Sequence, residues 1–146
     1  MASNQLTQFH EYAEGILTQL SPSARKQLAR DIAFKLRTAN RKRITAQIQP
    51  DGSKFQPPKK AGRIKRKMFI KLRTSRYLKV KSTPNQASVF INSTNRLVKV
   101  HHYGLRDRVN RKASFQVVYP KRELLGITGN DWQVVEELVL KHLTKE

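Results

Sequence analysis

The sequence contains no cysteine and few acidic residues: 10 Asp and Glu stand against 30 Lys and Arg, for a formal net charge of +20 over 146 residues. The absence of cysteine excludes disulfide scaffolds, thiolate zinc sites and cysteine nucleophiles. No apolar run approaches the roughly 20 residues of a membrane span, and Glu11 and Glu14 stand where a basic leader would lie. We therefore expect a soluble protein of the reducing cytoplasm, neither exported nor anchored, with one domain over residues 1–146.

Two helices are predicted between residues 4 and 49. The first has a core-facing stripe at helical spacing, formed by Leu6, Phe9, Ala13, Ile16 and Leu20. Oligomerisation through this stripe is the alternative, although its two heptads fall short of the three or four of a coiled coil. Ser21 and Pro22 are typical of the N-cap and first position of a second helix. Its apolar stripe comprises Leu28, Ile32, Leu36 and Ala39, with Ile44 and Ile48 as an extension. Pro50 disfavours helical geometry at Gln49, so this helix is expected to end there or earlier.

Residues 50–76 form a turn, a basic loop and a predicted short helix. Proline, aspartate and glycine at Pro50, Asp51 and Gly52 are turn residues. Residues 56–62 contain two prolines, two lysines and a glycine, which indicates an irregular loop. The next segment predicts a short amphipathic helix, because one face collects Ile64, Met68 and Leu72 with Phe69 beside them.

The region 77–119 contains the strand signals. Segments 77–82 and 87–92 are predicted to form an antiparallel hairpin around residues 83–86. Residues 93–104 fit a helix capped by Ser93 or Thr94 with Gly104 in the left-handed position, and also fit a strand; we favour the helix. Residues 105–114 are expected to be a loop and 115–119 a strand ended by Pro120.

A last helix is predicted over residues 131–144, with Asn130 as its cap and Trp132, Val135 and Val139 facing inward, together with Leu143 or His142. The fold class that follows is α+β. A small antiparallel sheet is covered by the N-terminal helices, the short basic helix and the C-terminal helix.

Positive charge is concentrated between residues 59 and 81, where 11 Lys or Arg occur without an acid. Three interpretations are open: a solvated face, non-specific contact with the phosphates of duplex DNA, or docking on an acidic protein surface. Only Phe69 and Tyr77 interleave with the charges, which argues against a platform for single-stranded nucleic acid. The candidate binding residues are Lys59, Lys60, Arg63, Lys65, Arg66, Lys67, Lys71, Arg73 and Arg76.

Catalytic chemistry has weak candidates. His101, His102 and Asp107 lie close in the sequence, as a metal-dependent nuclease would require. Adjacent side chains diverge on a helix and on a strand, so at most one histidine can serve a given site. We expect no catalytic site, no metal and no cofactor. One histidine is expected to be a buried hydrogen-bonding residue that ties the Tyr103–Gly104 turn to the sheet.

Four segments together resemble the phage virion morphogenesis family, the tail completion proteins of contractile-tailed phages. They are Pro50-Asp51-Gly52-Ser53-Lys54-Phe55, the basic run from Arg63 to Phe69, Val100 to Arg108 with its His101, Tyr103 and Gly104, and Val118 to Gly126 with its Pro120. The resemblance extends from about Leu20 to Leu143. The motif residues that it marks are Pro50, Asp51, Gly52, His101, Tyr103, Gly104, Pro120 and Gly126.

The resemblance implies a structural virion protein that completes the tail at its head-proximal end and prepares it for joining to the head. It implies as partners the tube, terminator and head connector proteins, with passing contact with duplex DNA, and a hexameric ring matched to the tube. Such a protein needs no enzymatic activity. It would assemble in the host cytoplasm. Charge alone favours an alternative, a small nucleic-acid-binding protein of ribosomal or nucleoid type.

Overall fold

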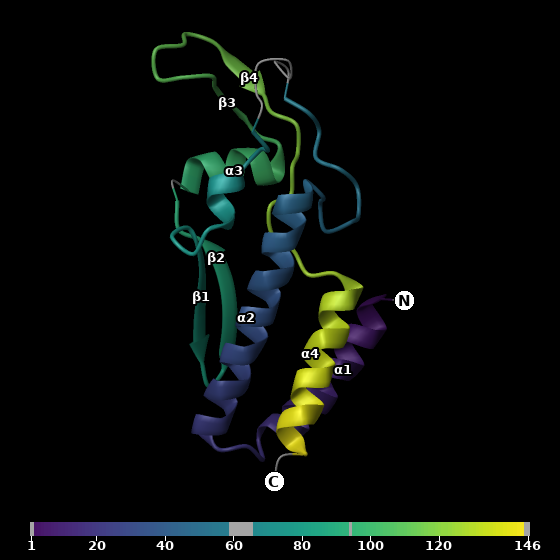
Figure 1. Ribbon diagram of the computed structural model, residues 1–146. Coiled ribbons are helices and arrows are strands. Elements are labelled where there is room, and N and C mark those ends of the chain that lie inside the picture. Colours follow the sequence, from purple (N-terminus) through teal and green to yellow (C-terminus); the bar gives the residue numbers. More distant parts are fainter. Residues whose placement is uncertain (1, 59–65, 94, 145–146) are drawn as a thin grey trace.

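The computed structural model describes residues 2–58, 66–93 and 95–144 and confirms the α+β class (Figure 1). Its elements are α1 (Ala2–Leu17), α2 (Pro22–Ala46), the 3-10 helix η2 (Ile70–Arg73), β1 (Leu78–Thr83), β2 (Gln86–Ile91), α3 (Asn95–Tyr103), β3 (Arg106–Arg108), β4 (Gln116–Val118) and α4 (Gly129–Leu143). The strands form two separate antiparallel pairs, β1–β2 and β3–β4. None of the described helices is both long and apolar enough to cross a membrane.

Helix α2 is the central element, with the β1–β2 hairpin on one side and α4 on another (Figure 1). It begins as predicted, because the Ser21 hydroxyl accepts a hydrogen bond from the Ala24 amide and Pro22 occupies the first turn. It ends at Ala46, and Gln47 takes the left-handed conformation with φ 59°. The predicted end before Pro50 is therefore confirmed.

The described core consists of two apolar clusters. One contains Leu20, Leu28, Val135 and Val139 and joins α2 to α4. The other joins the hairpin to the loops around it and contains Phe55, Leu72, Leu78, Ile91 and Leu124. The inward positions predicted for Trp132, Val135 and Val139 on α4 are confirmed, since all three pack in the first cluster.

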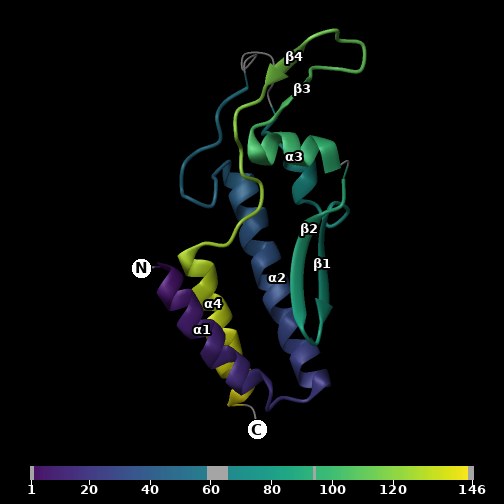
Figure 2. The ribbon, with the colours of Figure 1, turned by 180° about the vertical axis from the view of Figure 1, so that it is seen from behind.

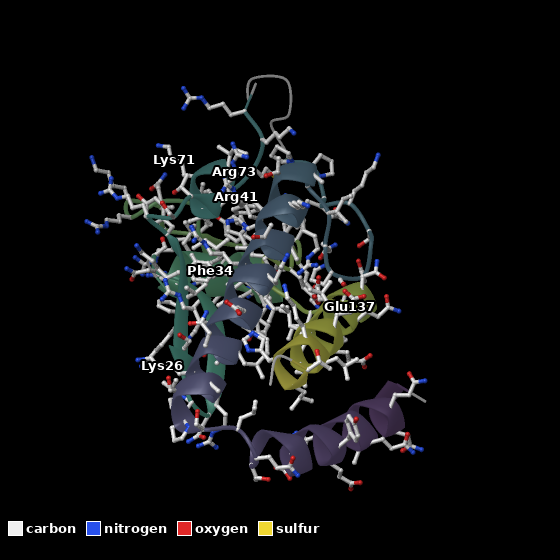
Figure 3. The ribbon with its side chains drawn as sticks, turned by 60° about the horizontal axis from the view of Figure 1, so that its bottom comes forward. Lys26, Phe34, Arg41, Lys71, Arg73 and Glu137 are labelled. Atoms are coloured by element: carbon white, nitrogen blue, oxygen red, sulfur yellow. The ribbon has the colours of Figure 1, made fainter. Side chains whose placement is uncertain are left out.

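Helix α1 leaves the start of α2 at an angle and stands apart from α4 across a groove (Figure 3). An apolar stripe was predicted for this helix. The structure does not describe the side chains of four of its members, Leu6, Phe9, Ala13 and Ile16. Its last member, Leu20, is buried after the end of α1, in the cluster with Leu28.

The short basic helix predicted around Met68 and Leu72 is present, in the part of the chain that the structure describes, only as the 3-10 helix η2. Phe69 takes the left-handed conformation with φ 60°, and only the 3-10 turn η2 follows. The reason lies 21 residues earlier in the chain. The Gln47 side chain accepts a hydrogen bond from the Met68 amide at 3.0 Å and donates one to the Met68 carbonyl at 2.8 Å. Ile64 lies outside the described residues.

Two further boundaries differ from the prediction. Residues Arg106–Arg108, expected in a loop, pair with Gln116–Val118 as strand β3. The cap of α4 is Thr128 and not Asn130. The Thr128 hydroxyl accepts from the Asp131 amide while the Asp131 carboxylate accepts from the Thr128 amide, which is a complete capping box. The predicted hairpin, the helix ending at Gly104 and the strand within 115–119 are confirmed.

Candidate functional site

The segment between β4 and α4 connects the motifs that carry the family resemblance (Figure 2). The Arg122 amide donates to the His101 carbonyl at 2.7 Å, and the Leu124 amide donates to His102 Nδ1 at 3.2 Å. The Glu123 amide donates to Gln49 Oε1 at 3.0 Å. Backbone groups of this irregular segment are thereby satisfied by α3 and by the connection that follows α2, as buried backbone requires.

Two glycines allow this segment to pack closely. A Cβ at Gly126 would lie 2.3 Å from Cγ of Pro50, a rigid ring that cannot move aside. Gly104 has φ 67°, and a Cβ there would lie 3.0 Å from the Lys121 amide nitrogen. At the Pro50-Asp51-Gly52 turn, the Asp51 carboxylate accepts from the Ser53 amide and Gly52 has φ 88°, as predicted for a turn. Motif residues that are distant in the sequence therefore meet in the fold.

One histidine was expected to tie the Tyr103–Gly104 turn to the sheet. In the structure His102 binds the segment between β4 and α4. His102 Nδ1 accepts from Leu124, and the His101 ring packs against Phe69 and Tyr119. Burial lowers the pKa of both imidazoles, and nearby Arg122 lowers the pKa of His101 further. Tyr103 is exposed.

The third residue of the nuclease alternative, Asp107, lies in β3, where the Arg96 guanidinium binds its carboxylate. This hydrogen bond lowers the pKa of Asp107. Across the described ranges, no group of three His, Cys, Asp or Glu is placed to hold a metal ion.

The lowered pKa of each histidine predicts a loss of stability in acid. Below about pH 6.5 the unfolded chain binds protons that the folded chain resists, so the free energy of unfolding should fall as pH drops from that value. Denaturant titrations at a series of pH values measure the slope. In His102→Asn the amide oxygen can still accept from Leu124 but does not titrate, so its slope should be smaller. A slope unchanged in that variant would contradict this account of His102.

A buried polar cluster fixes α4 to α2. Arg43 donates to Asp131 at 2.8 Å, to Asn40 Oδ1 at 2.8 Å and to the Gly126 carbonyl at 2.6 Å. Asn40 Oδ1 also accepts from the Gly126 amide at 3.0 Å. The side chains of Arg43 and Asp131 are 14% and 9% exposed, so the pair is shielded from water. We call these residues the Arg43 cluster.

Replacing Arg43 with methionine is expected to lower the free energy of unfolding by about 3 kcal/mol, because Asp131 is left buried without its counter-charge. Denaturant unfolding followed by circular dichroism measures the change. Arg41→Met, on the exposed side of the same helix, is the matched control and should change it by no more than about 0.5 kcal/mol. Equal losses in the two variants would show that the cluster does not stabilise the fold.

The structure describes five of the nine predicted binding residues. Lys59, Lys60, Arg63 and Lys65 lie outside the described residues. Arg66, Lys67 and Lys71 are exposed, and Arg73 is half-buried. Arg76 is exposed and lies over the Tyr77 ring, with 5.7 Å between its guanidinium carbon and the ring centroid.

The sequence prediction placed the binding cations only within residues 59–81. The structure adds cations of α2 to the same surface. A hollow of about 450 Å³ is lined by Arg41, Lys42, Lys67 and Arg73, among others. Lys67 donates to the Thr45 carbonyl at 3.0 Å and Arg73 donates to the Thr45 hydroxyl at 3.1 Å. These two bonds fix the later segment against α2 (Figure 3).

The surface continues along α2 toward its N-terminus. Lys26, Arg30, Phe34 and Arg41 recur at spacings of four and seven, which places them on one side of the helix. Phe34 is 40% exposed, and the Arg30 guanidinium carbon lies 5.6 Å from its ring centroid. We define the basic face as this set with Phe34 at its centre: Lys26, Arg30, Phe34, Arg41, Lys42, Lys67, Lys71 and Arg73.

No ion pair within the described ranges neutralises a cation of the basic face. Such a surface attracts polyanions and acidic protein surfaces through a field that salt screens. An exposed aromatic ring in the middle of it adds apolar contact area. One signal in the sequence could have extended the predicted site to α2. Arg30 and Arg41 lie off the apolar stripe of that helix, so helical spacing places both on its solvent-facing side.

Comparison with known proteins settles the relationship that the motifs suggest. The sequence profile of one family, described as the phage virion morphogenesis family, matches residues 4–144. The chain belongs to the phage virion morphogenesis family. It is similar to Tail completion protein S of Escherichia phage P2, with 40% identity over an alignment of 150 residues, gaps included, that covers 97% of this chain and 99% of that protein. No solved structure matches the chain significantly.

Proposed function

We propose that this protein is a structural component of the phage tail that completes the tail at its head-proximal end and prepares it for joining to the head. The observation that carries the proposal is the near full-length similarity to a protein named for tail completion. Family membership over residues 4–144 supports it. Four of the motif residues contact other segments inside the fold, as expected where a protein acts by presenting surfaces: Pro50, His101, Gly104 and Gly126. Such a role needs no enzymatic step.

The proposed assembly is a hexameric ring in the virion, matched to the symmetry of the tail tube. Its partners are the tube and terminator proteins on one side and the head connector on the other. A ring subunit uses two different patches, one for each neighbour. Assembly would take place in the host cytoplasm.

The basic face is the proposed docking surface. This face carries seven cations and the exposed Phe34 ring, and no ion pair in the described structure neutralises any of the seven, which suits the acidic surface of a tube or connector ring. Docking also agrees with the order of assembly, since a tail component must hold its place before any genome arrives. Contact with duplex DNA through phosphates is the second candidate, and the net charge of +20 favours it.

Position in the virion tests the proposal. The chain carries no cysteine, so Lys141→Cys on the exposed side of α4 offers a single thiol for a gold label. We expect electron micrographs of isolated tails to show gold at the end that joins the head. Gold at the baseplate end, or unlabelled tails from a phage that remains infectious, would contradict the proposal.

A further inference from the structure

The β3–β4 hairpin projects from the body of the protein, at the end opposite to the hairpin turn of β1–β2 (Figure 1). We call residues 105–118 the arm. Four of its apolar side chains are between 45% and 61% exposed: Leu105, Val109, Phe115 and Val118. An isolated two-stranded ribbon is marginal in water, and apolar groups gathered on an exposed ribbon are typical of an interaction site.

Charge accompanies these apolar groups on the arm. Val118 pairs directly with Arg106, and Gln116 pairs with Arg108, so the two arginines share one face of the ribbon with Val118. Arg111 and Lys112 lie in the exposed loop between the strands. The arm thus combines an apolar centre with several cations, and the partner that fits it is an apolar recess bordered by carboxylates.

An apolar recess with one carboxylate in its lining lies toward the opposite end of the same molecule. A groove of about 910 Å³ runs between α2, α4, α1 and the turn of the β1–β2 hairpin. Its apolar lining includes Leu28, Ile32, Trp132 and Val135. Its charged lining consists of Glu14 of α1, which pairs with His10, and Arg25 of α2. The exposed Glu136 lies one helical turn beyond Trp132, outside the lining.

We propose that the arm of one copy binds in this groove of a second copy. Exposed Val118 and Phe115 fill the apolar lining while the arm cations meet Glu14 and Glu136. The arm and its groove lie at opposite ends of the protein, so a copy cannot satisfy its own arm (Figure 1). The contact is heterologous, and its repetition gives a closed ring or an open filament. The inference deepens the ring that forms part of the proposed function.

Engineered thiols test the contact in the purified full-length chain, because the natural sequence has none. Gln116→Cys places a thiol on the exposed face of the arm, and Asn85→Cys places one in the groove wall. We expect the double variant, oxidised at about 0.5 M salt to screen the net charge, to form a ladder of multimers. A mixture of the two single variants should give dimers, and neither single variant alone should do so.

Two matched variants make the result specific. Ser75→Cys, exposed and outside the groove, replaces Asn85→Cys in a control with the same number of thiols and should give no ladder. Val118→Asp should slow cross-linking of the double variant about tenfold, as the loss of one buried valine contact predicts.

Dimers of the Gln116→Cys variant alone would indicate arm-to-arm pairing and overturn the proposal. The absence of a ladder with the double variant would overturn the proposal as well. The assay uses purified protein and no tails, so it tests the contact independently of the proposed function. If a ladder forms but the protein proves dispensable for tail completion, the contact is supported and only the role in the tail is contradicted.

Discussion

Phage that lack this protein are expected to produce filled heads and separate tails, with infectious particles reduced by several orders of magnitude. In the proposed role, the protein halts growth of the tail tube and forms the surface that meets the head connector. Without it, the tube end stays exposed to further subunits, so tails of irregular length should accompany the failure to join. Electron microscopy of the lysate, with plaque counts beside it, measures both effects.

Supply of the wild-type chain from a plasmid is the control and should restore joined particles. Intact virions with tails of ordinary length in the absence of the chain would contradict the account. Unjoined tails of ordinary length would retain the joining role and remove the role in halting tube growth.

Tails built with three neutral substitutions on the basic face are expected to have normal length and to fail in joining DNA-filled heads. The substitutions are Arg41→Gln, Lys42→Gln and Lys71→Gln, at exposed side chains that form no ion pair with any residue of the described ranges. Removing three cations takes away the attraction for an acidic ring and leaves the fold intact, because none of the three belongs to an apolar cluster.

The matched control removes the same charge elsewhere. The control substitutions replace three exposed lysines. They are Lys54→Gln in the connection from α2 to η2, Lys99→Gln in α3 and Lys141→Gln in α4. Tails with this triple should join heads as wild-type tails do. Equal joining by tails with either triple substitution would contradict docking through the basic face. Its charge would then be explained by contact with DNA or by exposure to solvent.

Salt dependence separates the DNA interpretation from docking. If the basic face contacts duplex DNA, the logarithm of the binding constant should fall linearly with the logarithm of salt concentration, and each lost phosphate contact should reduce the slope by about 0.9. Docking predicts that the basic-face triple fails in joining whatever happens to this slope.

Local signals predicted much of the fold. Ser21 with Pro22 marked the start of α2, and Pro50 limited its end, because both act through the backbone of their immediate neighbours. The alternation of apolar and polar residues predicted the β1–β2 hairpin, since it too depends on residues close together in the chain. The Thr128 cap was missed because Asn130 is an equally good cap by type, and the reciprocal bond from Asp131 decides between them.

Contacts between distant segments could not be predicted in this way. Gln47 binds both backbone polar groups of Met68 from 21 residues away, and nothing in the sequence around Met68 signals this contact. The basic face is likewise shared between α2 and the segment that ends at Arg73, joined through Thr45. The sequence indicated where positive charge was dense, but only the fold shows which cations share a surface.

Addition of purified protein to tails that lack it tests the central claim most directly. Such tails would be mixed with DNA-filled heads and increasing amounts of the wild-type chain, and joined particles counted by electron microscopy. The account predicts that joining rises with added protein until every tail end is occupied, and that the basic-face triple adds nothing. Tails that join heads equally well without added protein, or that stay unjoined at every amount of it, would contradict the claim.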